Sequence, residues 1–131
     1  MSGPLLLDTH VLLWTLRQPD RVPELTMALI RDPATELLVS AASAWEIGTK
    51  FRLGKLGEAQ AVVHAYEDHL HRLRARELQI SSHHALTAGL LNWDHRDPFD
   101  RIIAAQSMIE SVPLCTADPA LTAFPGLRVV W

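Results

Sequence analysis

Four acidic residues lie where one predicted element of this 131-residue chain gives way to the next: Asp8, Glu46, Asp100 and Asp118. Asp8 and Asp118 follow short apolar runs, whereas Glu46 and Asp100 fall near the starts of predicted helices. Carboxylates that converge at one edge of a sheet supply the oxygen ligands that Mg²⁺ and Mn²⁺ prefer, and these ions mainly serve phosphoryl transfer. The pattern therefore favours a metal-dependent nuclease.

These acids also have purely structural explanations. Ser43 and Glu46 have the spacing of a capping box, in which the glutamate bonds back to its own helix. Asp97 and Asp118, each followed by proline, fit helix N-caps, and Asp8 fits a turn. As a cluster, however, the carboxylates would repel and raise one another's pKa, and each pKa unit corresponds to a cost of about 1.4 kcal/mol. A bound cation removes this cost.

Length and composition predict one soluble, cytoplasmic domain spanning residues 1–131. With 48% hydrophobic residues, the chain can bury one core but is too short for two ordinary domains. Cys115 is the single cysteine, which excludes an internal disulfide and favours a reducing compartment. No apolar run reaches the roughly 18 residues of a membrane span, and no basic segment of a secretion signal precedes residues 5–7. The net charge of −3 argues against a strongly basic nucleic-acid binder, but less against a nuclease that binds divalent ions.

Alternating apolar runs and helical patterns predict an α/β fold with a short, mainly parallel central sheet covered on both faces. We expect strands at residues 5–7, 37–39, 78–80, 113–116 and 128–130. We expect helices at residues 9–16, 23–30, 43–51, 58–73, 82–91 and 99–110. Ligands of such sheets bind beyond the carboxyl ends of the strands, which is where Asp8 and Asp118 fall.

Four blocks in order carry a resemblance that spans nearly the whole chain: residues 5–14, 40–47, 96–106 and 116–118. In them the sequence resembles the PIN-domain family, in particular the VapC-type toxin ribonucleases of toxin–antitoxin operons. The resemblance implies a flavodoxin-like α/β/α sandwich, Mg²⁺ or Mn²⁺ dependence and endonucleolytic cleavage of RNA. It further implies an inhibitory antitoxin and a homodimer.

Carried onto this sequence, the resemblance assigns the catalytic and metal-binding roles to the four acids. Asp8, Asp100 and Asp118 would hold the ion, while Glu46 would orient the attacking water or help to hold a second ion. Four further residues are candidates for supporting roles around the site: Thr9, Thr116, Asp97 and Arg101. Of these, Asp97 is also the expected helix cap, and Arg101 is either a phosphate contact or a solvated arginine.

Two other functions fit parts of the pattern. A haloacid-dehalogenase-like phosphatase also places an aspartate after its first strand, but it needs a second acid where this chain has His10. A noncatalytic binding or receiver-like α/β module, with the acids as helix caps, needs no metal at all. It therefore remains the alternative to the nuclease.

Aromatic residues and histidines give weaker signals. Neither His83 with His84 nor His69 with His71 has the spacing of a transition-metal site on a helix. We expect Trp14 and Trp45 in the core, and Trp93 and Trp131 at a surface that stacks on bases or contacts a partner. The basic and apolar segment 50–56 is either an interface loop or an ordinary turn after a helix.

Overall fold

The computed structural model describes residues 3–57 and 60–131. Its strands are β1 (Gly3–Leu7), β2 (Thr35–Ser40), β3 (Ala75–Leu78), β4 (Leu114–Cys115) and β5 (Val129–Val130). Its α-helices are α1 (Thr9–Arg17), α2 (Glu24–Arg31), α3 (Ala41–Arg52), α4 (Gln60–His64), α5 (Tyr66–Arg72), α6 (Ser82–Leu90), α7 (Pro98–Glu110) and α8 (Pro119–Ala123). A short 3₁₀ helix, η1, spans Pro19–Arg21. None of the described helices is long and apolar enough to cross a membrane.

The five strands form one parallel sheet in the order β3-β2-β1-β4-β5. The register places Leu7 opposite Val39 of β2 and Cys115 of β4, so the central strands end at nearly the same level. The expected parallel sheet is therefore confirmed. Because β2, β1 and β4 are neighbours, the residues that follow them are brought to one edge.

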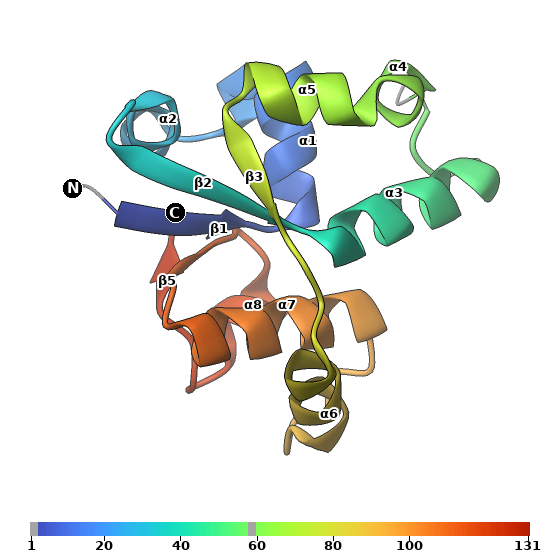
Figure 1. The fold of residues 1–131 in the computed structure, drawn as a ribbon, viewed down its shortest axis with the longest axis vertical. Coiled ribbons are helices and arrows are strands. Elements are labelled where there is room, and N and C mark those ends of the chain that lie inside the picture. The colour runs from blue at the N-terminus through green and yellow to red at the C-terminus, as the bar shows by residue number, and fades with distance from the viewer. Residues whose placement is uncertain (1–2, 58–59) are drawn as a thin grey trace.

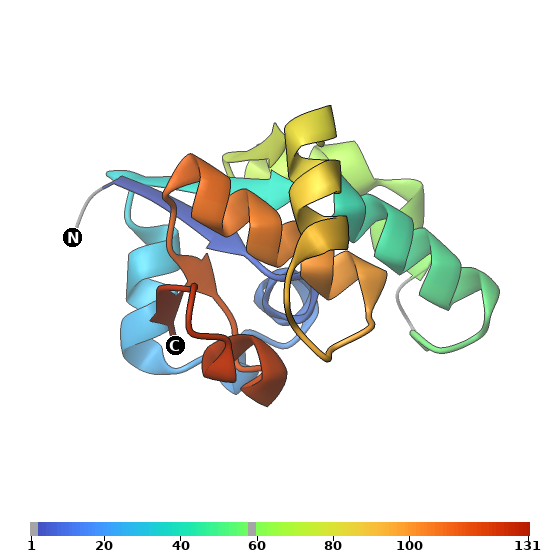
Figure 2. The ribbon, with the colours of Figure 1, turned by 90° about the horizontal axis from the view of Figure 1, so that it is seen from below.

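Apolar side chains alternate between the two faces of the sheet, and helices bury both faces. Leu5, Leu7 and Cys115 pack into a core with α1, α2 and α5, whereas Leu6 and Leu114 pack with α7 and α8 on the other side. Figure 1 shows the first group of helices above the sheet and the second group below it. The view from below shows α7 crossing the sheet with α6 beside it (Figure 2). The architecture is the predicted α/β/α sandwich.

Two predicted elements differ from the observed ones by more than their end residues. The helix expected over residues 58–73 is two helices, α4 and α5, because the backbone of Ala65 leaves helical geometry at φ −126° and ψ 34°. Residues 58 and 59 lie outside the described residues. The strand expected at 78–80 is β3, Ala75–Leu78, because its pairing with β2 stops where β2 ends at Ser40.

Candidate metal centre

Asp8 joins the end of β1 to the start of α1. Its Oδ1 accepts a hydrogen bond of 2.8 Å from the backbone N–H of Val11, so Asp8 is the N-cap of α1. Its Oδ2 accepts a hydrogen bond from the hydroxyl of Thr116, which follows the neighbouring strand β4. Asp8 is only 4% exposed, and burial raises the pKa of its carboxyl in spite of these bonds. Its negative charge is therefore costly unless a cation lies nearby.

Asp118 is held at the end of β4 through the same hydroxyl. The backbone N–H of Asp118 donates to Thr116 Oγ1 at 3.0 Å, so Thr116 links Asp8 with Asp118. Asp118 Oδ1 caps α8 by accepting from the N–H of Ala120 at 2.9 Å. The expected cap is confirmed. Thr116, proposed from the sequence as a supporting residue, contacts one carboxylate directly and the backbone of another.

Glu46 lies in α3, which follows β2 directly, and its side chain is only 3% exposed. Lys50 Nζ donates to Glu46 Oε2 at 2.5 Å from one turn further along the helix. The predicted capping box with Ser43 is wrong, because α3 begins two residues earlier and Ser40 caps it by accepting from the N–H of Ala42. Glu46 is therefore buried at the sheet edge without any capping role.

Ser43 contacts the other half of the sheet edge instead. Its hydroxyl lies 3.0 Å from the hydroxyl of Thr9, the first residue of α1. Thr9 was a candidate for hydrogen bonding to the carboxylates. Its hydroxyl instead bonds to Ser43 of α3. This bond holds the start of α1 against the start of α3.

Asp100 stands in the first turn of α7 beside two other potential ligands. Asp97 caps the helix by accepting from the N–H groups of Phe99 and Asp100 at 2.9 and 3.2 Å, as predicted. His95 Nε2 lies 2.6 Å from Asp100 Oδ2. One potential ligand atom from each of His95, Asp97 and Asp100 lies within 4.8 Å of the others. Among the described residues, this is the group with metal-ligand proximity.

Electrostatic contacts tie the four acids together although their carboxylates do not form one such tight group. Burial is the main reason that the pKa of Asp100 rises to about 6, and the charges of Asp97, Asp118 and Glu46 add to the rise. The charge of Asp118 also raises the pKa of Asp8. The four predicted carboxylates therefore share one electrostatic environment. A pocket of about 330 Å³, lined in part by Asp8 and Asp118, opens beside them.

His95 was missed by the sequence analysis, which examined histidines only for pairwise spacing on helices. The signal that was present is its place in the polar loop just before the Asp97 cap. A loop residue five positions before Asp100 reaches back to that carboxylate once the chain turns into α7. Of the described carboxylates at this edge, Asp100 bonds to His95 and Glu46 to Lys50.

Arg101 has a structural role, which corrects its assignment as either a phosphate contact or a solvated side chain. Its guanidinium donates to five backbone carbonyls at 2.8 to 3.4 Å, those of Ala88, Gly89, Leu91, Trp93 and His95. All five lie between the end of α6 and the loop that carries His95. Arg101 therefore fixes the loop beside the acids.

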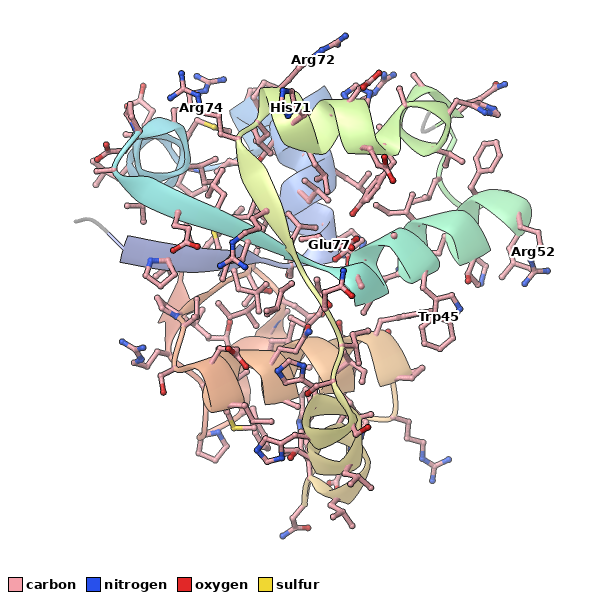
Figure 3. The ribbon with its side chains drawn as sticks, viewed as in Figure 1. Trp45, Arg52, His71, Arg72, Arg74 and Glu77 are labelled. Atoms are coloured by element: carbon pink, nitrogen blue, oxygen red, sulfur yellow. The ribbon has the colours of Figure 1, made fainter. Side chains whose placement is uncertain are left out.

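The tryptophans differ from expectation in two places. Trp45 was expected in the core but is 57% exposed, and Figure 3 shows it projecting from α3. Its ring packs edge-on against Phe99 of α7 at 4.5 Å, so the residues directly before Glu46 and Asp100 contact each other. Trp93, expected at the surface, is half-buried against Phe124 at 4.7 Å. Trp131 is 42% exposed and packs on Trp14.

The donor set fits a hard divalent cation. The four acids offer oxygen ligands, and one oxygen of Glu46, Asp100 and Asp118 is used in each case by a hydrogen bond among the described residues. Burial and mutual repulsion disfavour the ionised forms of Asp8 and Asp100. A cation of charge +2 with oxygen ligands offsets both effects.

The chain is thus an α/β/α protein with acidic residues at the carboxyl edge of its parallel sheet. Comparison with known proteins identifies its family. A family profile described as "PIN domain" matches residues 5–127, so this chain belongs to the PIN-domain family. The curated protein named Ribonuclease VapC16, from Mycobacterium tuberculosis (strain ATCC 25618 / H37Rv), is 33% identical over 100 residues, which cover 76% of this chain and 61% of the relative. The chain thus spans about three fifths of the length of that relative.

Solved structures confirm the fold over almost the whole chain. VapBC2 from Rickettsia felis, bound to a DNA fragment from its promoter, matches with a TM-score of 0.69 and 14% identity over 97% of both chains. A toxin–antitoxin complex from Klebsiella pneumoniae matches with a TM-score of 0.62 and 18% identity over 97% of this chain and 96% of that chain. At these identities the likeness concerns the fold.

Proposed function

We propose that this chain is a metal-dependent endoribonuclease that acts as the toxin of a type II toxin–antitoxin pair. The observation that carries the proposal is the electrostatic coupling of the four acids: the charge of Asp118 acts on Asp8, and the charges of Asp118 and Glu46 act on Asp100. The PIN family supports a nuclease, and the relative named a ribonuclease supports RNA as the substrate.

Asp8, Asp100 and Asp118 would hold Mg²⁺ or Mn²⁺, with Glu46 beside them. When bound, the ion would activate water and neutralise the charge that develops on the phosphodiester. The choice between the two metals rests on no feature of this chain, because both prefer carboxylate oxygens.

The protein's own groups position this set. Thr116 directs Oδ2 of Asp8 and the backbone of Asp118 toward the same edge of the sheet. Lys50 holds one oxygen of Glu46, which leaves the other to accept a hydrogen bond from the attacking water. His95 fixes the rotamer of Asp100 in the same way.

An antitoxin protein and a second copy of the chain are the proposed partners, and the cytoplasm is the proposed location. Support for an antitoxin comes from the fold shared with a toxin–antitoxin complex. Within the segment 50–56, Lys50 is engaged by Glu46, but Leu53 is 51% exposed and suits a contact with another protein. A mass well above 14.6 kDa in size-exclusion chromatography is expected, and a monomer at micromolar concentration would contradict the dimer.

The binding-module alternative has an observation in its favour. Asp8, Asp97 and Asp118 do cap helices, as that alternative requires. It leaves unexplained why Glu46, which caps nothing, is buried at the same edge. A metal-binding role accounts for all of these acids together.

Cleavage of labelled single-stranded and structured RNAs in Mg²⁺, Mn²⁺ or EDTA tests the proposal. We expect metal-dependent cutting that Asp8→Asn lowers by at least about 100-fold, equivalent to about 2.7 kcal/mol of barrier. Asparagine caps helices as well as aspartate does, so this change leaves α1 intact.

Asp32→Asn is the matched control. Asp32 Oδ1 accepts from the N–H of Ala34 at 2.9 Å in the turn before β2, at the opposite edge of the sheet. This variant should cut RNA like the parent. Equal cutting by the Asp8 variant, or no cutting of any RNA in either metal, would reject the nuclease and favour the binding module.

A further inference from the structure

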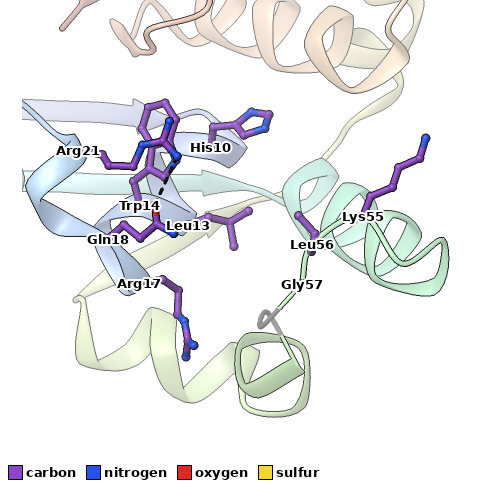
Figure 4. Close-up of a pocket in the computed structure, with 9 residues that line it drawn as sticks. All are labelled: His10, Leu13, Trp14, Arg17, Gln18, Arg21, Lys55, Leu56 and Gly57. Atoms are coloured by element: carbon purple, nitrogen blue, oxygen red, sulfur yellow. Dashed lines mark hydrogen bonds between the residues drawn. The ribbon is translucent and has the colours of Figure 1, made fainter.

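A second pocket lies next to the acidic one, between α1 with the turn η1 on one side and the turn at residues 55–57 on the other. Its volume is about 460 Å³. Figure 4 shows Arg21 and Trp14 on one side of it and Lys55 on the other, with His10 between them near one end. The pocket is therefore basic and aromatic, whereas the pocket beside it is acidic.

The two pockets share part of their lining. His10 and Trp14 line both of them, and the acidic pocket continues to Asp8 and Asp118. The imidazole of His10 is close enough to Asp8 for its charge to lower the pKa of that carboxyl. A polymer that enters the acidic site therefore has an adjacent channel in which to lie.

Charge distinguishes the channel from the acidic pocket beside it. Arg17, Arg21 and Lys55 line it, and none of its described lining residues is acidic. The chain as a whole carries a net charge of −3. A local group of cations on an acidic protein, beside a site that needs divalent ions, suits a polyanion rather than a neutral ligand.

The geometry presents these cations in a defined arrangement. Arg21 stacks over Trp14, with its guanidinium carbon 4.4 Å from the ring centre, and donates to Gln18 Oε1 at 3.3 Å. Trp131 packs on Trp14 at 5.8 Å. Trp14 therefore supports Arg21, which limits its rotamers and lowers the entropy lost on binding an anion.

We propose that this channel binds the RNA strand next to the scissile phosphate, with Arg21 and Lys55 contacting backbone phosphates and the exposed ring of His10 lying against a base at the junction. The inference rests on the nuclease function proposed above and deepens it. RNA is favoured over an acidic protein segment because the channel shares His10 and Trp14 with the pocket of the carboxylate site, where the phosphodiester must lie. The contacts are to phosphate and to the face of a base, so they give affinity with little sequence preference.

Metal-free binding separates this role from catalysis. The probe is a fluorescent single-stranded RNA, titrated in EDTA onto the Asp8→Asn protein, with and without the double change Arg21→Gln and Lys55→Gln. Loss of two phosphate contacts should raise Kd by about tenfold or more and lower the slope of log Kd against log salt by about 1.4. With Asp8 intact and metal present, the double change should raise KM and leave kcat within about twofold.

The matched control removes the same charge elsewhere. Arg31→Gln with Arg72→Gln alters another pocket, which shares no lining residue with the acidic one. This double variant should bind and cut RNA like the parent. An equal loss of binding in the control would mean a general charge effect and would overturn the channel.

The outcomes distinguish the two proposals. If the parent protein cuts no RNA, the nuclease itself fails. If the parent cuts RNA but the channel variant keeps its Kd, salt slope and KM, the channel proposal fails, and the pocket is left to a protein partner. Because Arg21 packs on Trp14, Lys55→Gln alone serves as a second variant in an exposed turn, with an expected slope change of about 0.7.

Discussion

The carboxylate site has two halves that the fold holds in different ways. Asp8, Thr116 and Asp118 sit at the ends of β1 and β4 and are joined by backbone amides and one hydroxyl. Glu46 and Asp100 sit on helices, and each of them bonds to a basic side chain instead. We call these the strand-borne half and the helix-borne half.

The difference concerns what keeps each half in place. The donors to the strand-borne half are backbone N–H groups and the hydroxyl of Thr116, none of which titrates. The pairing of β1 with β4 sets their positions. The helix-borne half depends on charged partners and on a loop that Arg101 ties down. The strand-borne half is therefore positioned by the sheet itself, whereas the helix-borne half is positioned by basic side chains and by the loop that Arg101 binds.

The largest expected effect on stability comes from Arg101→Ala, which removes a support of the helix-borne half and leaves the strand-borne half unchanged. Removing five hydrogen bonds to backbone carbonyls should lower the free energy of unfolding by about 3 kcal/mol. Urea denaturation measures this loss. Arg128→Ala, which removes one exposed bond to Ser111, should cost less than 1 kcal/mol. Similar losses in the two variants would contradict the special role of Arg101.

Metal binding should couple the two halves. Mn²⁺ at 100 times its Kd should stabilise the protein by about 2.7 kcal/mol, seen as a rise in Tm that EDTA reverses. Either Asp8→Asn or Asp100→Asn should remove most of the rise, since the proposed site takes its ligands from both halves. Asp94→Asn, an exposed acid in the same loop as His95, should retain it. A full rise in the Asp100 variant would confine the ion to the strand-borne half.

The smallest expected effect is a pH dependence in the helix-borne half. Folding raises the pKa of Asp100 from 3.8 to about 6, so between these values the folded state holds a proton that the unfolded state has lost. Metal-free stability should therefore fall as pH rises from about 4 to 6, by about 1 kcal/mol after solvent screening.

Asp100→Asn isolates this contribution. The difference in unfolding free energy between the variant and the parent should grow in favour of the variant over that pH range, measured by urea denaturation in EDTA. Titrating groups that do not interact with Asp100 cancel in the difference. A pH-independent difference would show that Asp100 ionises normally in the folded protein.

The strand-borne half was predictable from the sequence, and the reason is physical. A short apolar run that ends in an acid marks the carboxyl end of a buried parallel strand, and parallel strands gather those ends at one edge. Asp8 and Asp118 follow from this rule, and Asp97 follows from its position before a proline. The sandwich architecture follows from the same alternation of elements.

For the helix-borne half, the sequence predicted the two acids but not the residues that hold them in place. Glu46 and Asp100 were identified, but the expected capping box misplaced the start of α3. The bonds of Arg101 go to carbonyls, which every residue has, so no side-chain pattern indicates them. His95 acts through a loop conformation that local sequence does not determine. Contacts made by irregular backbone are thus the part that requires the structure.

Cys115, buried without exposure in β4, gives the molecule an internal reporter of its own opening. Burial, aided by the charge of Asp8, raises the pKa of its thiol to about 12, so alkylating reagents meet almost no thiolate in the closed sheet. Modification then proceeds only through molecules in which β4 has separated from its neighbours. The alkylation rate of this single thiol therefore measures how often the strand that leads to Asp118 comes loose.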